Sequence, residues 1–187
     1  MPSVILGQAA LLENGASGGG FIGGVEVNTQ GIAAQGGIIG TISGRFDIGA
    51  LVAKELFVKY GSPAATSLHF ELFGLREGQP KGCPLSLSGF YQITNISFLD
   101  FRTYGFSVYK RLGEKRGSFF QPTVSAFQIK ENRNYRNDVK GILLGFSVAA
   151  GMSDEAIFHM TPSMTIIKDV NTFTIVMGIS FSDTPVE

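Results

Sequence analysis

The sequence contains no tryptophan and a single cysteine, and only 16% of its 187 residues are charged. Cys83 has no second cysteine for an internal disulfide and no ligands at a zinc-like spacing, which excludes a disulfide scaffold and a zinc site. The 15 basic residues are balanced by 15 acidic ones, so we expect no nucleic-acid partner. No window offers the roughly 18 consecutive apolar residues that a membrane helix requires.

Glycine and phenylalanine are abundant instead, with 25 and 16 residues. Together with frequent serine and threonine, they are typical of many short strands joined by tight turns, so we expect an all-β fold. The length fits one domain over 1–187. Residues 1–6 lack the basic region and cleavage site of a signal peptide, which indicates either a protein that is not exported or a mature chain restarted with methionine.

Long uncharged segments alternate with short charged clusters. The segments without Asp, Glu, Lys or Arg are 83–99, 117–129, 141–153, 156–167 and 170–182. The charged clusters between them include 110–116 and 130–140. Because a soluble sheet normally carries charge at every second position of its solvated face, charge that is confined to the segment ends requires another explanation.

Within these segments the residues alternate between two faces. In the last segment Phe173, Ile175, Met177, Ile179 and Phe181 share one wholly apolar face, and small or polar residues such as Thr174 and Ser180 share the other. The segments 85–94, 141–150 and 156–167 alternate in the same way. Period-two alternation over this length predicts strands with one large apolar face and one small, polar, uncharged face.

A transmembrane barrel accounts for both faces, since the apolar face meets lipid and the small polar face lines a narrow lumen. The runs of 10–13 residues suit tilted membrane strands, which need roughly 9–11 residues. Aromatic residues near the segment ends suit the interfacial girdles of such a barrel. They are Tyr104, Tyr109, Phe119, Phe120, Phe158, Phe173 and Phe181.

Turn residues and charge clusters divide the chain into ten strands of an antiparallel up-and-down transmembrane β-barrel. We expect them near 19–28, 32–42, 46–56, 66–75, 84–94, 102–111, 118–130, 139–150, 156–167 and 171–181. An even number places both termini on one side. Residues 48–60 also fit an amphipathic helix between Asp47 as N-cap and Gly61, which would leave eight strands. Residues 1–18 form either a flexible tail or a segment inserted into the lumen.

Four stretches resemble bacterial outer-membrane β-barrel proteins of eight to ten strands. NTFTIVMGISF at 171–181 looks like their closing strand, and the polar tail 182–187 that follows departs from their aromatic last residue. ISGRFDIGA at 42–50 looks like a tight periplasmic turn and the strand after it. FFQPTVSAF at 119–127 and FHMTPSMTI at 158–166 each carry a central proline beside threonine. The resemblance implies the bacterial outer membrane as location and the lipid bilayer as partner.

Few residues are candidates for chemistry. His69 and Glu71 share one face of a strand, and His159 lies on the polar face of a later one, so they form either a lumen site or a network that staples the barrel. The candidate lumen or ligand residues are Asp47, His69, Glu71, Gln92, Gln121 and His159. No nucleophile, phosphate-binding or metal motif occurs, so we assign no catalytic residue, metal or cofactor. The basic cluster Lys110, Arg111, Lys115 and Arg116 is either a solvated turn or a site for lipid phosphates.

The interpretation favoured by these patterns is a non-enzymatic barrel that acts as a narrow channel or transporter for a small-molecule solute, or as a structural membrane protein. A soluble barrel that carries an apolar ligand is the first alternative, and its apolar face would point inward. A barrel enzyme that acts on lipid or peptide is the second. The sequence names neither the solute nor the oligomeric state.

Overall fold

A computed structural model of the chain describes residues 12, 15–29, 31–56, 63–78, 81–97, 99–113, 118–131, 138–153, 155–168 and 170–183. The described residues form strands and turns. Among them, no helix is long and apolar enough to cross a membrane.

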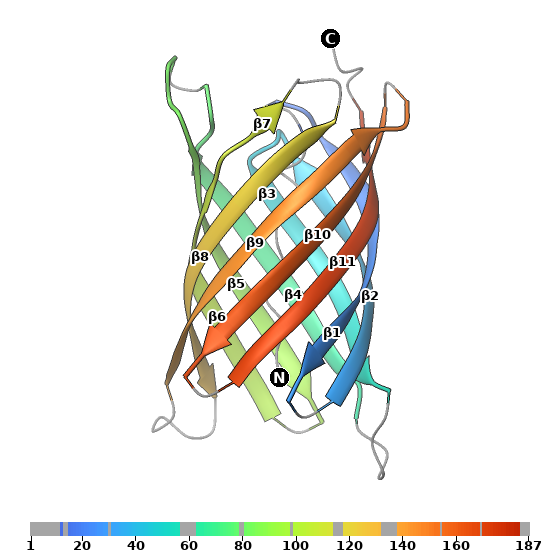
Figure 1. The fold of residues 1–187 in the computed structure, drawn as a ribbon, viewed down its shortest axis with the longest axis vertical. Coiled ribbons are helices and arrows are strands. Elements are labelled where there is room, and N and C mark those ends of the chain that lie inside the picture. Colours follow the sequence, from blue (N-terminus) through green and yellow to red (C-terminus); the bar gives the residue numbers. More distant parts are fainter. Residues whose placement is uncertain are drawn as a thin grey trace.

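Ten long strands and one two-residue strand form a single sheet that closes on itself (Figure 1). In chain order they are β1 (Gly18–Asn28), β2 (Gly31–Ile42), β3 (Phe46–Glu55), β4 (Ala65–Leu75), β5 (Ser86–Ile96), β6 (Leu99–Tyr109), β7 (Leu112–Gly113), β8 (Phe119–Glu131), β9 (Val139–Gly151), β10 (Ala156–Ile167) and β11 (Val170–Ser182). The short β7 pairs with β8 just beyond the end of β6, so the wall has ten positions. The prediction of a ten-stranded antiparallel barrel is confirmed.

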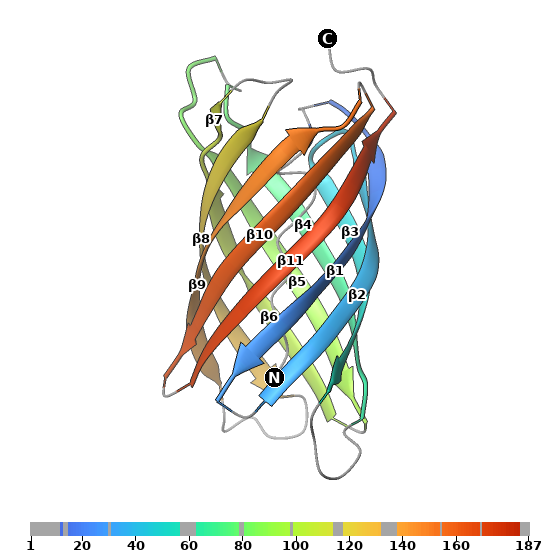
Figure 2. The same ribbon diagram turned by 45° about the vertical axis from the view of Figure 1, so that its right-hand side comes forward.

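Strands that are neighbours in the sequence pair antiparallel, except that β6 does not pair with β7, and the pairings of β1 with β11 and of β6 with β8 complete the ring. β1 pairs with β11 from Gly18 opposite Ser182 to Asn28 opposite Thr172, and β6 pairs with β8. Both the start of β1 and the end of β11 therefore lie at one end of the barrel, called here the termini end, as an even strand number predicts. The strands are strongly tilted, as the two views show (Figures 1 and 2). Closure leaves no open sheet edge, which a bilayer would penalise.

The tight turn expected within 42–50 joins β2 to β3. Ser43 and Gly44 both have positive φ angles, 53° and 58°, and the amide of Arg45 donates to the carbonyl of Ile42 at 3.0 Å. This is the type I′ geometry, whose twist matches that of the flanking strands. Glycine at the second position adopts the left-handed conformation without a Cβ penalty.

The barrel has an apolar outer wall and a largely polar inner wall. Phe146 on β9 is 39% exposed and its neighbour Ser147 is 3% exposed, and Met164 and Thr165 on β10 are 40% and 9% exposed. The same alternation repeats on the other long strands, so large apolar side chains cover the outside. The soluble alternative, in which the apolar face points inward, is therefore wrong. The outer wall is that of a protein surrounded by lipid hydrocarbon.

Part of the interior is apolar, which the alternation did not lead us to expect. Phe90, Phe127, Ile129, Leu143 and Ile167 form a buried cluster on the walls of β5, β8, β9 and β10. These residues occupy inward-facing positions of their strands. They therefore stand where other inward positions carry polar side chains, and none of them faces lipid. The large apolar side chains at these positions fill part of the barrel interior.

Inward-facing glycines bring the strands close together. A Cβ atom on Gly24, Gly37 or Gly105 would collide with the carbonyl of a paired strand, that of Ile175, Ala50 or Ala126 respectively. Outward-facing glycines such as Gly23 have no such contact, since the nearest atom to a Cβ there is 3.8 Å away. Glycines at these inward positions permit the sharp curvature that a small barrel requires.

Three sequence predictions need correction. The helix alternative over 48–60 is wrong within the described residues, because Phe46–Glu55 is a strand paired on both sides with β2 and β4; residues 57–62 lie outside the described chain. The bounds of two strands also differ from the prediction. Strands were expected at 84–94 and 102–111, whereas β5 is Ser86–Ile96 and β6 is Leu99–Tyr109. The polar residues Asn95 and Asp100 indicated a loop, but they lie on the outward face at the strand ends.

Two of the seven proposed girdle residues point inward. Tyr109 and Phe119 are 3% exposed, whereas Phe120, Phe158, Phe173 and Phe181 are between 39% and 47% exposed. Tyr109 is five residues from the outward-facing Tyr104, and Phe119 is adjacent to the outward-facing Phe120, so alternation places them on the opposite face.

The tail predicted to follow the last strand contributes to the wall. Ser182 is the last residue of β11 and pairs with Gly18, and the amide of Asp183 donates to the carbonyl of Ser17 at 2.8 Å. Asp183 Oδ1 also accepts the amide of Ser17 at 2.8 Å. The closing strand therefore extends past the phenylalanine at 181, because the polar residues after it still find backbone partners.

Candidate functional site

The inner wall is lined mostly by hydroxyl groups. Serine and threonine at inward positions of the long strands are almost wholly buried, and several bond across strands. The pairs are Ser67 with Thr94 at 2.9 Å, Ser107 with Ser125 at 2.7 Å and Ser147 with Thr161 at 2.8 Å. A hydroxyl both donates and accepts, so this lining suits neutral polar molecules.

Glu71 is the centre of a buried cluster on β4, β5 and β6. The Tyr109 hydroxyl donates to Glu71 Oε1 at 2.7 Å, and the Ser88 hydroxyl donates to the same oxygen. His69 lies two residues earlier on the same inward face, with its Nε2 3.6 Å from Glu71 Oε2. Glu71 and His69 are 1% and 0% exposed. The two hydroxyl donors replace part of the hydration that this buried carboxyl group loses.

Asp47 lies beside this cluster and accepts a hydrogen bond from the Thr41 hydroxyl at 2.7 Å. Asp47 and Glu71 are register partners on β3 and β4, and His69 and Gln92 are register partners on β4 and β5. Gln92 is 0% exposed and donates from Nε2 to Thr94 Oγ1 at 3.1 Å. Four of the six candidate residues therefore lie together on three adjacent strands.

The other two candidates lie on β10 and β8, outside the three strands that carry the first four. His159 on β10 is five positions from β4 in a wall of ten strands, which places it opposite His69. Its imidazole lies against Gly178 of β11, where a Cβ atom would come within 2.6 Å of His159 Nε2. Gln121 on β8 is 2% exposed and is a register partner of Ser147. All six candidates are buried inside the barrel; their role as ligands stays a prediction.

Several buried polar groups have no hydrogen-bond partner in the described part of the chain. They are both ring nitrogens of His69, both ring nitrogens of His159, and the hydroxyls of Thr103, Thr123 and Ser180. An unsatisfied buried polar group costs about 1–3 kcal/mol, so such groups require a reason. A polar molecule that enters the barrel would supply the missing partners.

A buried arginine that the sequence analysis did not select lies at the termini end. Arg76, just beyond β4, is 6% exposed and donates from Nη2 to the carbonyl of Leu12 at 2.6 Å. Its guanidinium lies 4.9 Å from the centre of the Phe73 ring. Burial lowers the pKa of Arg76 to about 10, and nearby Asp47 opposes this shift. Arg76 therefore keeps its charge at neutral pH.

Leu12 itself is 1% exposed, so the chain immediately before β1 lies inside the barrel at this point. The choice between a flexible tail and a lumen-inserted segment for residues 1–18 stays a prediction, because residues 1–11, 13 and 14 lie outside the described chain. Sequence signals for Arg76 and Leu12 are weak, because their positions follow from loops and not from strand alternation. Tyr109 could have been found from its parity relative to Tyr104.

The basic cluster after β6 is engaged within the protein where it is described. Lys110 Nζ lies 2.6 Å from Glu77 Oε1, and the amide of Arg111 donates to Glu77 Oε2 at 2.8 Å. The Arg111 guanidinium lies 3.8 Å from the centre of the inward-facing Phe119 ring. These two side chains therefore bind Glu77 and Phe119 of the barrel; Lys115 and Arg116 lie outside the described residues.

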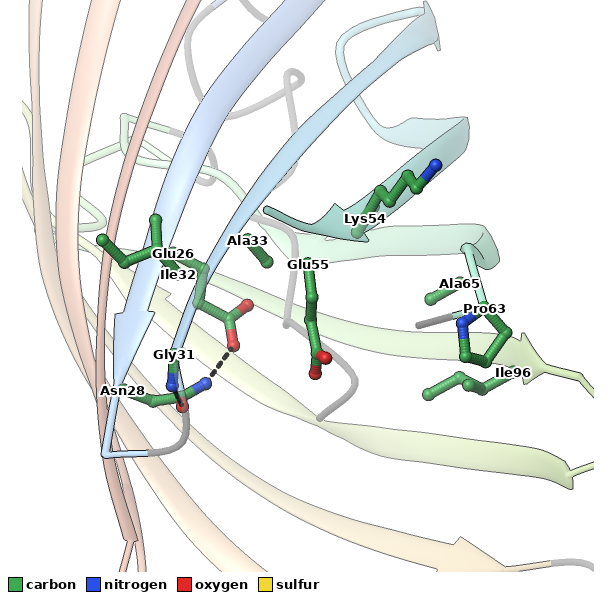
Figure 3. A pocket seen from close by; sticks show the side chains of 11 residues that line it. Glu26, Asn28, Gly31, Ile32, Ala33, Lys54, Glu55, Pro63, Ala65 and Ile96 are labelled. Atoms are coloured by element: carbon green, nitrogen blue, oxygen red, sulfur yellow. Dashed lines mark hydrogen bonds between the residues drawn. The ribbon is translucent and has the colours of Figure 1, made fainter. Parts of the chain in front are cut away.

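A small acidic mouth opens at the end of the barrel where β1 ends and β2 begins (Figure 3). Glu26 on β1 and Glu55 on β3 flank Ala33 of β2 in register, and their carboxylates point into the same space in Figure 3. Asn28 donates to Glu26 Oε1 at 3.3 Å, while Lys54 points away from the opening. The enclosed space is about 50 Å³. Within the described chain, no three His, Cys, Asp or Glu side chains could hold a metal ion together.

Comparison with known proteins finds similarity of fold without similarity of sequence. The β domain of the Bordetella autotransporter BrkA aligns with a TM-score of 0.53 at 10% identity, over 89% of this chain and 99% of that one. The KdgM porin, solved in complex with disordered oligogalacturonate, aligns with a TM-score of 0.50 at 7% identity, over 88% and 99%. No protein-family model and no curated protein matches the sequence. The chain thus has the fold of an outer-membrane β-barrel, whose outer wall implies a lipid bilayer.

Proposed function

We propose that the protein is a bacterial outer-membrane barrel that conducts small polar solutes, uncharged or cationic, through a narrow bore. The observation that carries this proposal is the inner wall of buried hydroxyl, amide and imidazole groups, which can hydrogen-bond to a polar solute. A barrel with a purely structural role would be more stable if these groups were apolar or fully paired. A conducting barrel retains them, because each passing solute is hydrogen-bonded in turn.

Charge placement supports the class of solute. Glu26 and Glu55 make one mouth acidic, and Asp47 and Glu71 lie further inside. Negative side chains near a pore attract cations and repel anions. We therefore do not transfer the oligogalacturonate of the KdgM structure to this protein, because galacturonate units carry carboxylates.

The bore is narrow at the termini end. Arg76 and Leu12 meet inside the barrel, and Phe73 and Tyr109 pack beside them with ring centres 5.4 Å apart. A hydrogen bond from a charged guanidinium is worth about 1.5–3 kcal/mol net, so thermal motion can open it. Conduction is therefore limited by this contact, and its loss widens the path.

Solute passage through vesicles tests the proposal. Purified protein is reconstituted in phosphatidylcholine vesicles, and glycerol entry is measured by light scattering. We expect vesicles with the wild-type protein to swell faster than empty vesicles, and vesicles with Arg76→Ala to swell faster still. The double variant with the isosteric changes Thr103→Val and Thr123→Val should swell more slowly than the wild type. Val124→Leu, on the outward face beside Thr123, is the matched control and should leave the rate unchanged. Swelling no faster than in empty vesicles for both the wild type and Arg76→Ala would exclude conduction.

A further inference from the structure

The outer wall carries one groove that the conduction proposal does not use. It lies on the outward face of β4, β5 and β6 and has a volume of about 520 Å³, within the range of about 300–1,000 Å³ typical of ligand sites. Its lining is mostly apolar and includes Phe70, Leu72, Tyr91, Tyr104 and Phe106 around Gly89. The groove arises because a glycine stands where the neighbouring strands carry large side chains.

The strand register explains the shape of the groove. Gly89 on β5 is paired with Leu72 on β4 and with Phe106 on β6, so the missing side chain leaves a gap between two large ones. A Cβ atom on Gly89 would have its nearest neighbour, the carbonyl oxygen of Gly105, 3.9 Å away. The next row, Tyr91 paired with Tyr104, forms an aromatic edge on one side of the gap.

A row of basic residues lies directly beyond that edge. Arg102 on β6 and Lys130 on β8 are register partners, and Lys140 on β9 is paired with Gln128, two residues before Lys130. We call these three outward-facing residues the basic row. Lys54 is the one other outward lysine or arginine in the described strands, and it lies on β3. The strands thus concentrate outward positive charge beside the groove.

Tyr104 belongs to both features. Lys130 Nζ lies 5.5 Å from the centre of the Tyr104 ring, whose other neighbours line the groove. Arg102 is two residues from Tyr104 on the same outward face, a spacing of about 6.6–6.8 Å along a strand. One molecule with an anionic group joined directly to a hydrocarbon chain would therefore reach the basic row and the groove together.

The acidic residues nearby leave part of this charge available. Asp138 accepts a hydrogen bond from Gln128 and lies 3.7 Å from Lys130 Nζ, and Asp100 lies two residues before Arg102. Arg102 and Lys140 are exposed and form no ion pair with any residue that the structure describes. Three cations thus face two carboxylates, one of which is already shared between Gln128 and Lys130.

We propose that this face binds one anionic phospholipid, with its phosphate on the basic row and an acyl chain in the groove over Gly89. A lipid is the occupant that fits, because the groove opens onto the hydrocarbon side of the wall and its charged end lies near the strand ends. A neutral lipid can fill the same groove, but it gains no attraction to the basic row. That attraction is of the order of 1 kcal/mol for each Lys or Arg near a membrane surface. The site is independent of solute conduction.

Lipid binding to the purified barrel tests the proposal. Native mass spectrometry from a neutral detergent counts bound lipid while dioleoyl phosphatidylglycerol or dioleoyl phosphatidylcholine is added. We expect one phosphatidylglycerol to bind with at least about fivefold preference over phosphatidylcholine, the effect of one basic contact. Inorganic phosphate in millimolar excess should not displace it, because phosphate alone lacks the chain that fills the groove.

Two sets of variants separate the headgroup from the chain. Arg102→Gln with Lys140→Gln should abolish the preference for phosphatidylglycerol, whereas Lys54→Gln should preserve it. Gly89→Leu fills the groove and should reduce binding of both lipids, whereas Gly23→Leu, at an equally open outward glycine on β1, should not. Each variant is first checked for the gel shift of a folded barrel. Equal binding of the two lipids by the wild type, displacement by phosphate, or full binding by Gly89→Leu would each overturn the assignment.

Discussion

Gly23 and Gly24 are adjacent in β1 but occupy opposite steric environments. A Cβ atom on Gly24 would collide with the carbonyl of Ile175 on β11, whereas a Cβ atom on Gly23 would have its nearest neighbour, the carbonyl oxygen of Gln35, 3.8 Å away. The difference arises because the curvature of a small barrel compresses the inner face and opens the outer one.

Substitution of these two glycines measures that compression. Gly24→Ala should lower the free energy of unfolding by about 1–3 kcal/mol, the cost of overpacking, while Gly23→Ala should change it by less than about 0.5 kcal/mol. Reversible urea unfolding in lipid vesicles gives both values. Equal effects of the two substitutions would mean that the inner face is not compressed at this point.

The outward orientation of Phe146 predicts its response to charge. Phe146→Arg should cost about 2–4 kcal/mol if the residue lies near the bilayer midplane, because the guanidinium must leave water. Phe146→Leu keeps an apolar side chain at the same position and serves as the control, with a cost of less than about 1.5 kcal/mol. Unfolding in vesicles is again the measurement, and similar losses for arginine and leucine would place this face outside the hydrocarbon.

Tyr109 should stabilise the barrel through its hydroxyl. Tyr109→Phe removes a donor from the buried carboxylate of Glu71 and should cost about 1.5–3 kcal/mol, the range for hydrogen bonds to charged groups. Tyr91→Phe removes a hydroxyl on the exposed outer wall and should be close to neutral. If the two variants unfold at the same denaturant concentration, Glu71 does not depend on Tyr109.

The acidic mouth should set ion selectivity. In a planar bilayer with a potassium chloride gradient, the reversal potential should indicate a preference for potassium over chloride. Glu26→Gln with Glu55→Gln should shift the reversal potential towards zero, and Lys54→Gln, whose side chain points away from the mouth, should leave it unchanged. A preference for chloride in the wild type would contradict the charge argument.

Barrel closure should depend on β11. Deletion of 171–187 leaves the backbone groups of β1 and β10 unpaired in hydrocarbon at a cost of several kcal/mol per group, so the chain should fail to form a barrel. Deletion of 184–187 keeps Ser182 and Asp183 with their partners on Gly18 and Ser17, and should preserve folding. Different gel mobility of unheated and boiled samples reports the folded barrel. Folding of the longer deletion would show that closure uses another strand.

The sequence predicted the wall well, because period-two alternation reports directly which side chains share a face. It placed Phe146 and Ser147 on opposite faces, and the structure agrees. It assigned Tyr109 to the outer girdle because Tyr109 lies near a segment end, but the alternation of faces along the strand places it inside. It could not find the contact between Arg76 and Leu12, since both residues lie outside the regular alternation and meet only when the ring is closed.

The candidate interior residues show the same limit. Each of the six has the inward parity that the alternation predicts, yet the sequence could not show that Asp47, His69, Glu71 and Gln92 lie together on neighbouring strands while His159 lies opposite. That separation depends on the order and register of the ring. It also could not show the groove over Gly89, because a glycine on the outer face becomes a gap only beside Leu72 and Phe106.

The pairing of β1 with β11 also determines when the protein can fold. β1 leaves the ribosome before β11, its partner at the closing seam, so the ring cannot exist until β11 has been synthesised. During that interval its lipid-facing side chains have neither lipid nor a core to cover them, and such exposed surface promotes aggregation. Pairings between residues so distant in the chain also form slowly. The unclosed chain is therefore most prone to aggregation until β11 has paired with β1.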